Sequence, residues 1–156
     1  MIQLVSSSFY RERDTKEALI KFIRSAKRFS CGDVAETFER NFAQFQNRKD
    51  MVYFHSGSSA NLGLMQALLN MGKLKSGDAV GFSAVTWATN VMPLMQLGLK
   101  PVPIDIELDT LNVSSRQLAI TIKRHKLRAL FITNALGFCD DIDNIQKLCA
   151  KKIFFS

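Results

Sequence analysis

Residues 75–106 read KSGDAVGFSAVTWATNVMPLMQLGLKPVPIDI, and this stretch decides the fold class. A glycine–aspartate turn opens an apolar run at residues 79–85 that predicts a strand. Residues 86–97 have the length and apolar content of a helix, and residues 101–106 predict a second strand. A strand, a helix and a strand in immediate succession predict a crossover between parallel strands.

The same alternation continues on both sides of this stretch. Before it, residues 51–55 predict a strand and residues 58–71 predict a helix rich in Ala, Leu and Met. After it, the expected elements are a helix at 114–124, a strand at 128–135, a helix at 140–150 and the start of a strand at 152–155. We therefore expect a three-layer α/β/α fold whose mostly parallel sheet is covered by helices on both faces.

The first 50 residues have a different pattern, without alternating strands. A first helix is expected to place Ala18, Leu19, Phe22, Ile23 and Ala26 on one face. A break at residues 29–33 separates it from a second helix, whose apolar positions are Val34, Phe38, Phe42 and Phe45. We expect two parts, an N-terminal helical segment at 1–50 and an α/β domain at 51–156.

Composition excludes several classes of protein. The chain has 156 residues, of which 47% are apolar, and this is enough for one domain with a buried core. No apolar run reaches the length of a membrane span and the N-terminus lacks the features of a signal peptide, so we expect a cytoplasmic protein. The three cysteines lack Cys-x-x-Cys spacing, so we expect free, buried thiols. Two scattered histidines predict no metal site.

The net charge of +7 raises the question of nucleic-acid binding. The basic residues are spread along the chain, and no known nucleic-acid-binding module is visible. We interpret them as a solvated surface suited to an anionic ligand and expect no nucleic-acid partner.

The first candidate site follows the strand expected at 51–55. There Ser56-Gly57-Ser58-Ser59 leads into a helix, and Gly57 would permit a tight turn while Ser58 or Ser59 caps the helix. The free N–H groups, the helix dipole and the hydroxyls favour an anion, which predicts a phosphate cradle. The same residues are also an ordinary helix start, and the glycine patterns of dinucleotide sites and P-loops are absent.

The second candidate site lies at the end of the strand expected at 79–85. Trp87 is the only tryptophan, and ligands on parallel sheets bind at the carboxyl ends of strands. Its ring could stack on a planar cofactor, or it could be a core or interface residue. Asp105, Asn134, Asp140 and Asp141 also follow strands, where they could contact a ligand or cap the next helix.

Together these segments resemble the DegT/StrS-type sugar aminotransferases, a family of fold type I enzymes that depend on pyridoxal phosphate. The matching segments are 56–62, 77–80, 86–93, 98–102, Asp105, 110–113, 135–137 and 141–143. The resemblance covers roughly residues 31–149. The Gly-Ser-Ser-Ala-Asn and Ala-Leu-Gly segments also resemble the branch that includes sugar 3-dehydratases of lipopolysaccharide biosynthesis.

The resemblance implies pyridoxal 5'-phosphate, or pyridoxamine 5'-phosphate, as the cofactor. It implies that Ser58 and Ser59 bind the phosphate, that Trp87 stacks on the pyridine ring and that Asp33 lies near the substrate. Asn134 departs from the family, which often has a histidine at this position. The implied partners are a keto-sugar nucleotide, an amino donor and a second copy of the chain, for the synthesis of cell-surface polysaccharide sugars.

The resemblance also implies groups that do not occur by residue 156. These are an aspartate that pairs with the pyridine nitrogen and, later, the lysine that forms the Schiff base, which is a histidine in the dehydratase branch. We therefore expect residues 51–156 to be a truncated large domain, a fragment that is inactive alone, and we assign no catalytic residue.

Three hypotheses follow for the function. The chain is the N-terminal part of an aminotransferase, or of a sugar 3-dehydratase of the same family. Alternatively, it is a non-catalytic binding or assembly half-domain. A generic nucleotide-binding α/β domain is the third, and the missing glycine fingerprint argues against it.

Overall fold

The computed structural model describes residues 9–153 and divides the chain into two compact units, Met1–Tyr53 and Phe54–Ser156. Unit 1 contains helices α1 (Glu12–Ser25) and α2 (Asp33–Phe45), joined through the expected break. The helix α1 buries none of its residues, and Leu19 and Ile23 of its expected apolar face are about half exposed. No helix among residues 9–153 is long and apolar enough to cross a membrane.

Unit 2 alternates helices and strands around a three-stranded sheet. Its elements are α3 (Gly57–Asn70), β1 (Ala79–Ser83), α4 (Ala88–Gln96), β2 (Lys100–Ile104), α5 (Ser115–Arg124), β3 (Leu127–Phe131), the 3₁₀ helix η1 (Ala135–Gly137) and α6 (Ile142–Lys152). The strand order is β2-β1-β3, and β1 pairs in parallel with both neighbours. The predicted α/β class with a parallel sheet is confirmed.

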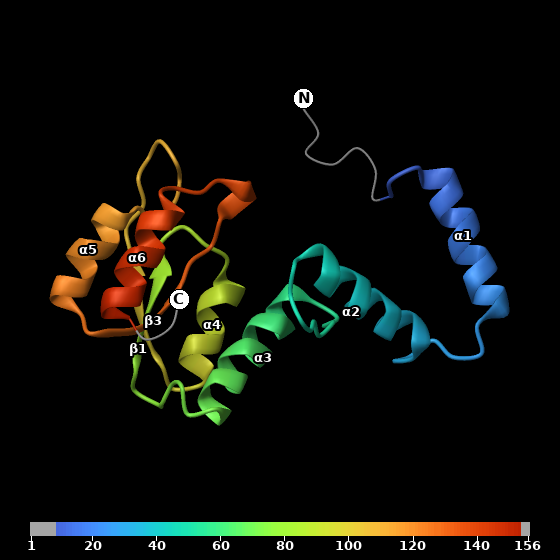
Figure 1. The fold of residues 1–156 in the computed structure, drawn as a ribbon, viewed down its shortest axis with the longest axis horizontal. Coiled ribbons are helices and arrows are strands. Elements are labelled where there is room, and N and C mark those ends of the chain that lie inside the picture. Colours follow the sequence, from blue (N-terminus) through green and yellow to red (C-terminus); the bar gives the residue numbers. More distant parts are fainter. Residues whose placement is uncertain (1–8, 154–156) are drawn as a thin grey trace. The chain divides into compact units, whose positions relative to one another are not determined.

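Helices cover both faces of this sheet, as Figure 1 shows for α3 and α4 on one side of the strands and α5 and α6 on the other. Val80 and Ala129 point to the first face, where they pack with Met65 of α3 and Leu94 of α4. The strand side chains alternate between the two faces, so their neighbours build the opposite core. Unit 2 is therefore the three-layer arrangement that the sequence predicts.

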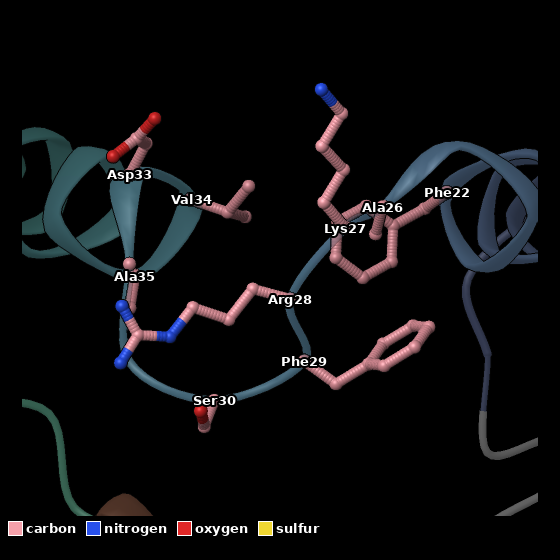
Figure 2. Close-up of a pocket in the computed structure, with 10 residues that line it drawn as sticks. Phe22, Ala26, Lys27, Arg28, Phe29, Ser30, Asp33, Val34 and Ala35 are labelled. Atoms are coloured by element: carbon pink, nitrogen blue, oxygen red, sulfur yellow. The ribbon is translucent and has the colours of Figure 1, made fainter.

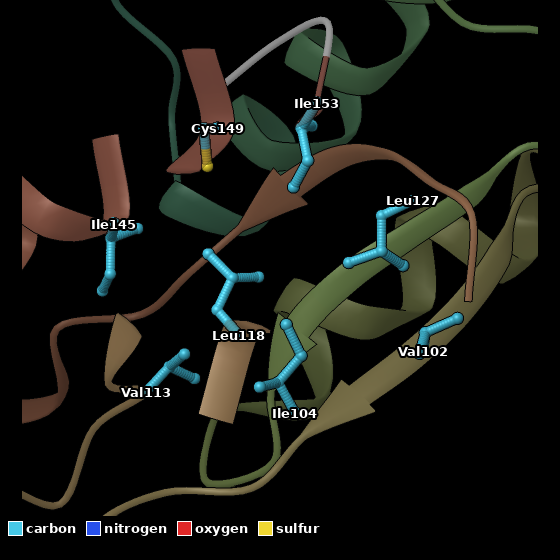
Figure 3. Packing of buried hydrophobic residues seen from close by; sticks show 8 residues of the cluster. All are labelled: Val102, Ile104, Val113, Leu118, Leu127, Ile145, Cys149 and Ile153. Atoms are coloured by element: carbon cyan, nitrogen blue, oxygen red, sulfur yellow. The ribbon is translucent and has the colours of Figure 1, made fainter. Parts of the chain in front are cut away.

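The core of the second face joins α5 and α6 to the sheet (Figure 3). Leu118 of α5 is fully buried and belongs to the same cluster as Ile104 of β2 and Leu127 of β3. Ile145 and Cys149 of α6 complete the cluster from the other helix. This packing holds the two outer strands in place beside β1.

The strand expected at residues 51–55 does not form. The backbone N–H of Tyr53 donates to the Glu39 carboxylate at 2.8 Å, and its ring packs edge-on against Phe38. A side chain of α2 therefore takes the donor that a neighbouring strand would need. Residues 51–54 are irregular, and Val52 is largely exposed.

Other expectations need smaller corrections. The strand expected at 152–155 does not begin at Lys152, because this residue ends α6. Ile153 lies outside regular structure. Residues 154–156 lie outside the described part of the chain. The thiols of Cys31 and Cys139 are exposed, because they lie in connecting segments, and only Cys149 is buried. Burial raises the pKa of the Cys149 thiol.

We expect the Leu118→Ala substitution to lower the free energy of unfolding by about 2–5 kcal/mol, because it leaves a cavity between α5 and the sheet. Urea denaturation of the 156-residue chain measures this loss. The matched control is Ile120→Ala on the same helix, where the side chain is 37% exposed. Its cost should stay below about 1 kcal/mol, and equal losses for both variants would contradict the packing described.

Candidate functional site

The connections of the sheet define a topological switch point between two strand ends, which we call the crevice. The crossover from β1 to β2 runs through α4 on one face, and the crossover from β2 to β3 runs through α5 on the other. The helix that follows β3 is α6, which packs on the same face as α5, so the chain leaves the neighbours β1 and β3 toward opposite faces. Such a switch point, at the carboxyl ends of the strands, is where ligands bind on open parallel sheets.

Trp87 lies at this switch point, four residues after the end of β1. It is the N-cap residue of α4, and its side chain is 57% exposed. Within residues 9–153 its ring contacts no other aromatic ring. The structure therefore leaves the indole available to a ligand, and the alternative that Trp87 is a core residue is wrong.

The beginning of α3 is capped by Ser56, and not by Ser58 or Ser59 as we expected. The Ser59 backbone N–H donates to Ser56 Oγ at 3.2 Å. Among the described residues, no acceptor contacts the backbone N–H groups of Gly57 and Ser58, and the Ser58 hydroxyl has no partner. The first turn of α3 thus presents three unused donors.

The space around this helix start suits an anion. A Cβ added to Gly57 would meet no atom within 4 Å, and the backbone of Gly57 is not left-handed, so the glycine gives room and not a special turn. Neither α3 nor α4 contains a charged residue. The unpaired N–H groups and the helix dipole are therefore the local source of positive potential.

A hydrogen bond joins the starts of α3 and α4. Asn61 Nδ2 donates to Asn90 Oδ1 at 2.7 Å, and the two helices pack against each other on the same face of the sheet. Asn61 lies in the second turn of α3 and Asn90 in the first turn of α4. This bond places Trp87 and the free donors of Ser58 at neighbouring helix ends.

Asn90 also ties these helices to both strand ends. Its Nδ2 donates to Thr86 Oγ1 at 2.9 Å and to Thr133 Oγ1 at 2.7 Å, and the two hydroxyls lie 2.7 Å apart. Thr86 follows β1 and Thr133 follows β3, so the amide bridges the crevice at the switch point. The Asn90 amide therefore donates both of its protons to the two threonines, and its oxygen accepts from Asn61.

A second polar group supports the loop after β3. The buried Asn112 donates from Nδ2 to Asn134 Oδ1 at 2.7 Å and to the carbonyl of Phe138 at 3.0 Å. The Thr133 backbone N–H donates to Ser83 Oγ at 3.0 Å. Asn134 therefore has a structural contact in this chain.

Sequence reasoning did not assign a role to Asn90, Thr86, Thr133 or Asn112. The available signal was a polar residue shortly after each of two strands, which topology brings to the same edge of the sheet. Pairing these residues required the strand order, which the sequence pattern did not specify.

Asp33 belongs to unit 1, whereas the residues described above belong to unit 2. It is the first residue of α2 and lines a hollow of about 390 Å³ around the α1–α2 connection, shown in Figure 2. Lys27, Arg28 and Phe29 also line this hollow. The carboxylate of Asp33 makes no hydrogen bond or ion pair with another described residue.

The carboxylates near the carboxyl edge of the sheet have structural partners. Asp141 accepts from the backbone N–H of Ser115, at 2.7 Å, and from its hydroxyl, which anchors the start of α5. Burial acts to raise the pKa of Asp141, but these hydrogen bonds outweigh it and hold the pKa below its usual value. Asp140 accepts from Thr110 at 2.7 Å, and Asp105 accepts from the N–H of Ile106.

Glu107, after β2, is paired with Arg116. The Arg116 guanidinium donates to both carboxylate oxygens, at 2.8–3.2 Å, and Ser114 donates to one of them. The hydrogen bond from Arg116, followed by that from Ser114, holds the pKa of Glu107 below its usual value. This pair lies at the start of α5, and the Arg116 guanidinium is engaged by Glu107.

The described lysines of unit 2 lie toward the opposite edge of the sheet. They follow α3, begin β2, end or follow α5, or lie in the second half of α6: Lys73, Lys75, Lys100, Lys123, Lys126, Lys147 and Lys151. Helices that return between parallel strands run antiparallel to them, so the helix C-termini meet at the amino edge of the sheet. These lysines therefore do not line the crevice.

A doubly wound sheet with an exposed indole and a free helix start at its switch point defines an α/β domain with a candidate ligand site at the carboxyl edge of the sheet. The particular family is shown by comparison with family models. Residues 10–154 match the DegT/DnrJ/EryC1/StrS aminotransferase family, and the chain belongs to this family. The predicted family is thus confirmed.

Individual relatives agree with this assignment. The chain is 34% identical over 153 residues to GDP-4-keto-6-deoxy-D-mannose 3-dehydratase of Yersinia pseudotuberculosis, covering 97% of this chain and 38% of the relative. It is 29% identical over 120 residues to GDP-perosamine synthase of Vibrio cholerae, covering 77% of this chain and 31% of the synthase. The chain therefore spans less than two fifths of the length of either relative.

A solved structure shares the fold over nearly all of the chain. The E. coli GDP-4-keto-6-deoxy-D-mannose-3-dehydratase with bound hydrated pyridoxal phosphate matches with a TM-score of 0.87 and 30% identity. The match covers 99% of this chain and 40% of that structure.

We expect Thr133→Val to destabilise the chain by about 1–3 kcal/mol, because it leaves Thr86 and Asn90 without a shared partner in a half-buried site. The emission of Trp87 should shift as well, since Asn90 lies in the first turn after this residue. Urea denaturation and tryptophan fluorescence measure the two effects.

The matched control for this variant is Thr89→Val, at an exposed position of α4 whose side chain makes no hydrogen bond with a described residue. It should change neither quantity. If Thr133→Val behaves like Thr89→Val, the network does not brace the crevice.

Proposed function

We propose that this chain holds and orients pyridoxal 5'-phosphate, or pyridoxamine 5'-phosphate, in an enzyme that acts on a keto-sugar nucleotide. One observation carries the proposal: the unused donors of Gly57 and Ser58 and the exposed ring of Trp87 lie at neighbouring helix ends, linked through Asn61 and Asn90. A phosphate on a planar ring needs these two features side by side.

The donor set fits a phosphate group. The N–H groups of Gly57 and Ser58 and the Ser58 hydroxyl supply hydrogen bonds, and the dipole of the 14-residue helix α3 adds positive potential. No acidic residue lies in its first turn to repel an anion. We assign Ser58 to phosphate binding on this basis, and Ser59 with it, because its hydroxyl lies in the same first turn of α3.

Trp87 is assigned to the ring of the cofactor. A 57% exposed indole at the carboxyl edge of a parallel sheet offers a flat apolar face to a planar heterocycle. The network of Asn90 with Thr86 and Thr133 limits the movement of the segment that carries the ring.

When bound, the cofactor supplies an electron sink for the reacting carbons of the substrate. The residues of unit 2 described above hold and orient it. The described lysines of this unit lie toward the far edge of the sheet, so they do not provide an amine at the crevice. We therefore propose that the 156-residue chain binds cofactor but does not transfer an amino group by itself.

The substrate class is inferred from the relatives. The dehydratase and the perosamine synthase both carry GDP-linked sugars in their names, and another relative is named for lipopolysaccharide biosynthesis. We propose a nucleotide-linked keto-sugar of cell-surface polysaccharide as the substrate, with amino transfer as the reaction and 3-dehydration as the alternative. Asp33, which lines the hollow in unit 1, is proposed to lie near this substrate.

We also propose that the family member containing this chain acts as a homodimer. The support is the apolar surface of unit 1, where α1 buries no residue and Leu19, Ile20 and Ile23 are each about half exposed. Apolar side chains on one helix face favour burial against a second surface.

The cofactor proposal predicts that pyridoxal 5'-phosphate quenches the fluorescence of Trp87 in a saturable manner. Pyridoxal, which lacks the phosphate, should quench far less at the same concentration. Because Trp87 is the only tryptophan, the signal reports on this site alone. Absence of saturable quenching would reject the proposal.

Ser58→Ala should weaken the binding of pyridoxal 5'-phosphate by about tenfold, the loss of one hydrogen bond to a charged group. The matched control is Ser115→Ala, in the first turn of α5, where the hydroxyl contacts Asp141. That variant should keep the wild-type dissociation constant, and equal weakening would point to a general loss of structure.

The dimer proposal predicts that light scattering gives twice the mass of one chain, and that Ile23→Glu shifts the protein toward one chain. Lys21→Glu, a charge change on the same helix outside the expected apolar face, should leave the mass unchanged. A wild-type chain that remains folded and monomeric at high concentration would contradict this proposal.

A further inference from the structure

A chain of hydrogen bonds connects His55 to the start of α3. The Ser59 N–H donates to Ser56 Oγ at 3.2 Å, and Ser56 Oγ donates to Ser59 Oγ at 3.1 Å. The Ser59 hydroxyl in turn lies 2.9 Å from His55 Nε2, where either atom can be the donor. His55 is exposed and makes no other hydrogen bond with a described residue.

The number of protons available in this hydrogen-bond network limits which acceptors the Ser59 hydroxyl can donate to. A serine hydroxyl has one proton and two lone pairs, and Ser59 Oγ already accepts from Ser56. If His55 Nε2 carries no proton, Ser59 must donate its single proton to the ring. It then has no proton for a phosphate oxygen.

The opposite protonation state releases the hydroxyl. If Nε2 carries a proton, the ring donates to Ser59 Oγ, which then accepts twice and keeps its own proton for another acceptor. The imidazolium always meets this condition, whereas the neutral ring meets it in only one of its two tautomers.

We propose that His55 is a positioning residue that controls whether Ser59 donates to the phosphate of the cofactor. The inference rests on the proposed function, in which the start of α3 is the phosphate site. It makes phosphate binding depend on the protonation of one imidazole, through a neighbouring serine.

Few other charged groups of unit 2 lie at this edge. The helices α3 and α4 carry none, and neither do residues 54–62, 84–87 and 132–134. Five carboxylates follow β2 or precede α6, and none of their hydrogen bonds with described residues reaches His55: Asp105, Glu107, Asp109, Asp140 and Asp141. Binding adds the titrating group of the ligand, a phosphate whose second pKa is about 6.

The test compares the binding of pyridoxal 5'-phosphate by the wild type and by His55→Phe between pH 5.5 and 8.5, followed by Trp87 fluorescence. The ratio of the two dissociation constants removes the titration of the ligand, which is common to both. We expect the wild type to weaken relative to the variant by about fivefold as the pH rises, the effect of one ordinary hydrogen bond.

The route through Ser59 is tested by repeating the comparison in the Ser59→Ala background. There His55→Phe should leave the pH profile unchanged, because no hydroxyl remains to be controlled. A persistent effect would show that the imidazolium acts directly on the phosphate, and this would overturn the proposal.

Nitrogen NMR of the two histidine rings gives a readout that does not depend on affinity, and His55→Phe assigns the signals. We expect the protonation of His55 Nε2 to differ between the free and the saturated chain, with the proton present when pyridoxal 5'-phosphate is bound. The role of His55 would be rejected if its Nε2 had the same protonation in the free and the saturated chain, or if the ratio of the two dissociation constants did not change with pH. Either result would leave the cofactor site itself intact. Failure of the wild type to bind at any pH would instead reject the proposed function.

Discussion

Side chains of the two outer strands of unit 2 pack over Gly81, at the centre of β1, and the rest of the domain depends on this contact. A Cβ at this position would lie 2.8 Å from Cδ1 of Ile104 and 2.9 Å from Cδ1 of Leu127. Because the glycine has no side chain, residues from β2 and β3 fill the space above the middle strand. Leu118 of α5 then packs in the same cluster, which fixes the helix layer on this face.

The site follows from the same arrangement. With β1 between β2 and β3, the chain leaves the two neighbours β1 and β3 toward opposite faces, and their carboxyl ends form the topological switch point. Asn90 spans this crevice by contacting the threonines that follow both strands. Its oxygen receives the bond from Asn61, so one amide aligns two strand ends and two helix starts.

Local patterns predicted the parts of this fold that local forces determine. The turn, the apolar run and the helix at residues 75–106 placed β1, α4 and β2 to within a few residues, since side-chain periodicity specifies them. The strand expected at residues 51–55 failed because Glu39 takes the N–H of Tyr53, a contact 14 residues away. The bridge from Asn90 to Thr133 spans 43 residues and depends on strand order, which no local pattern contains.

The placement of the basic residues in unit 2 follows from the electrostatics of its helices. Basic residues stabilise the negative C-terminal ends of helices, as Lys123 and Arg124 do in the last turn of α5. In an alternating α/β fold these ends lie at the amino edge of the sheet, away from the crevice. The positive N-terminal ends lie at the carboxyl edge, where α3 presents backbone donors without a competing acidic side chain. The same antiparallel geometry thus places helix-start donors, and not the described lysines of unit 2, at the carboxyl edge of the sheet.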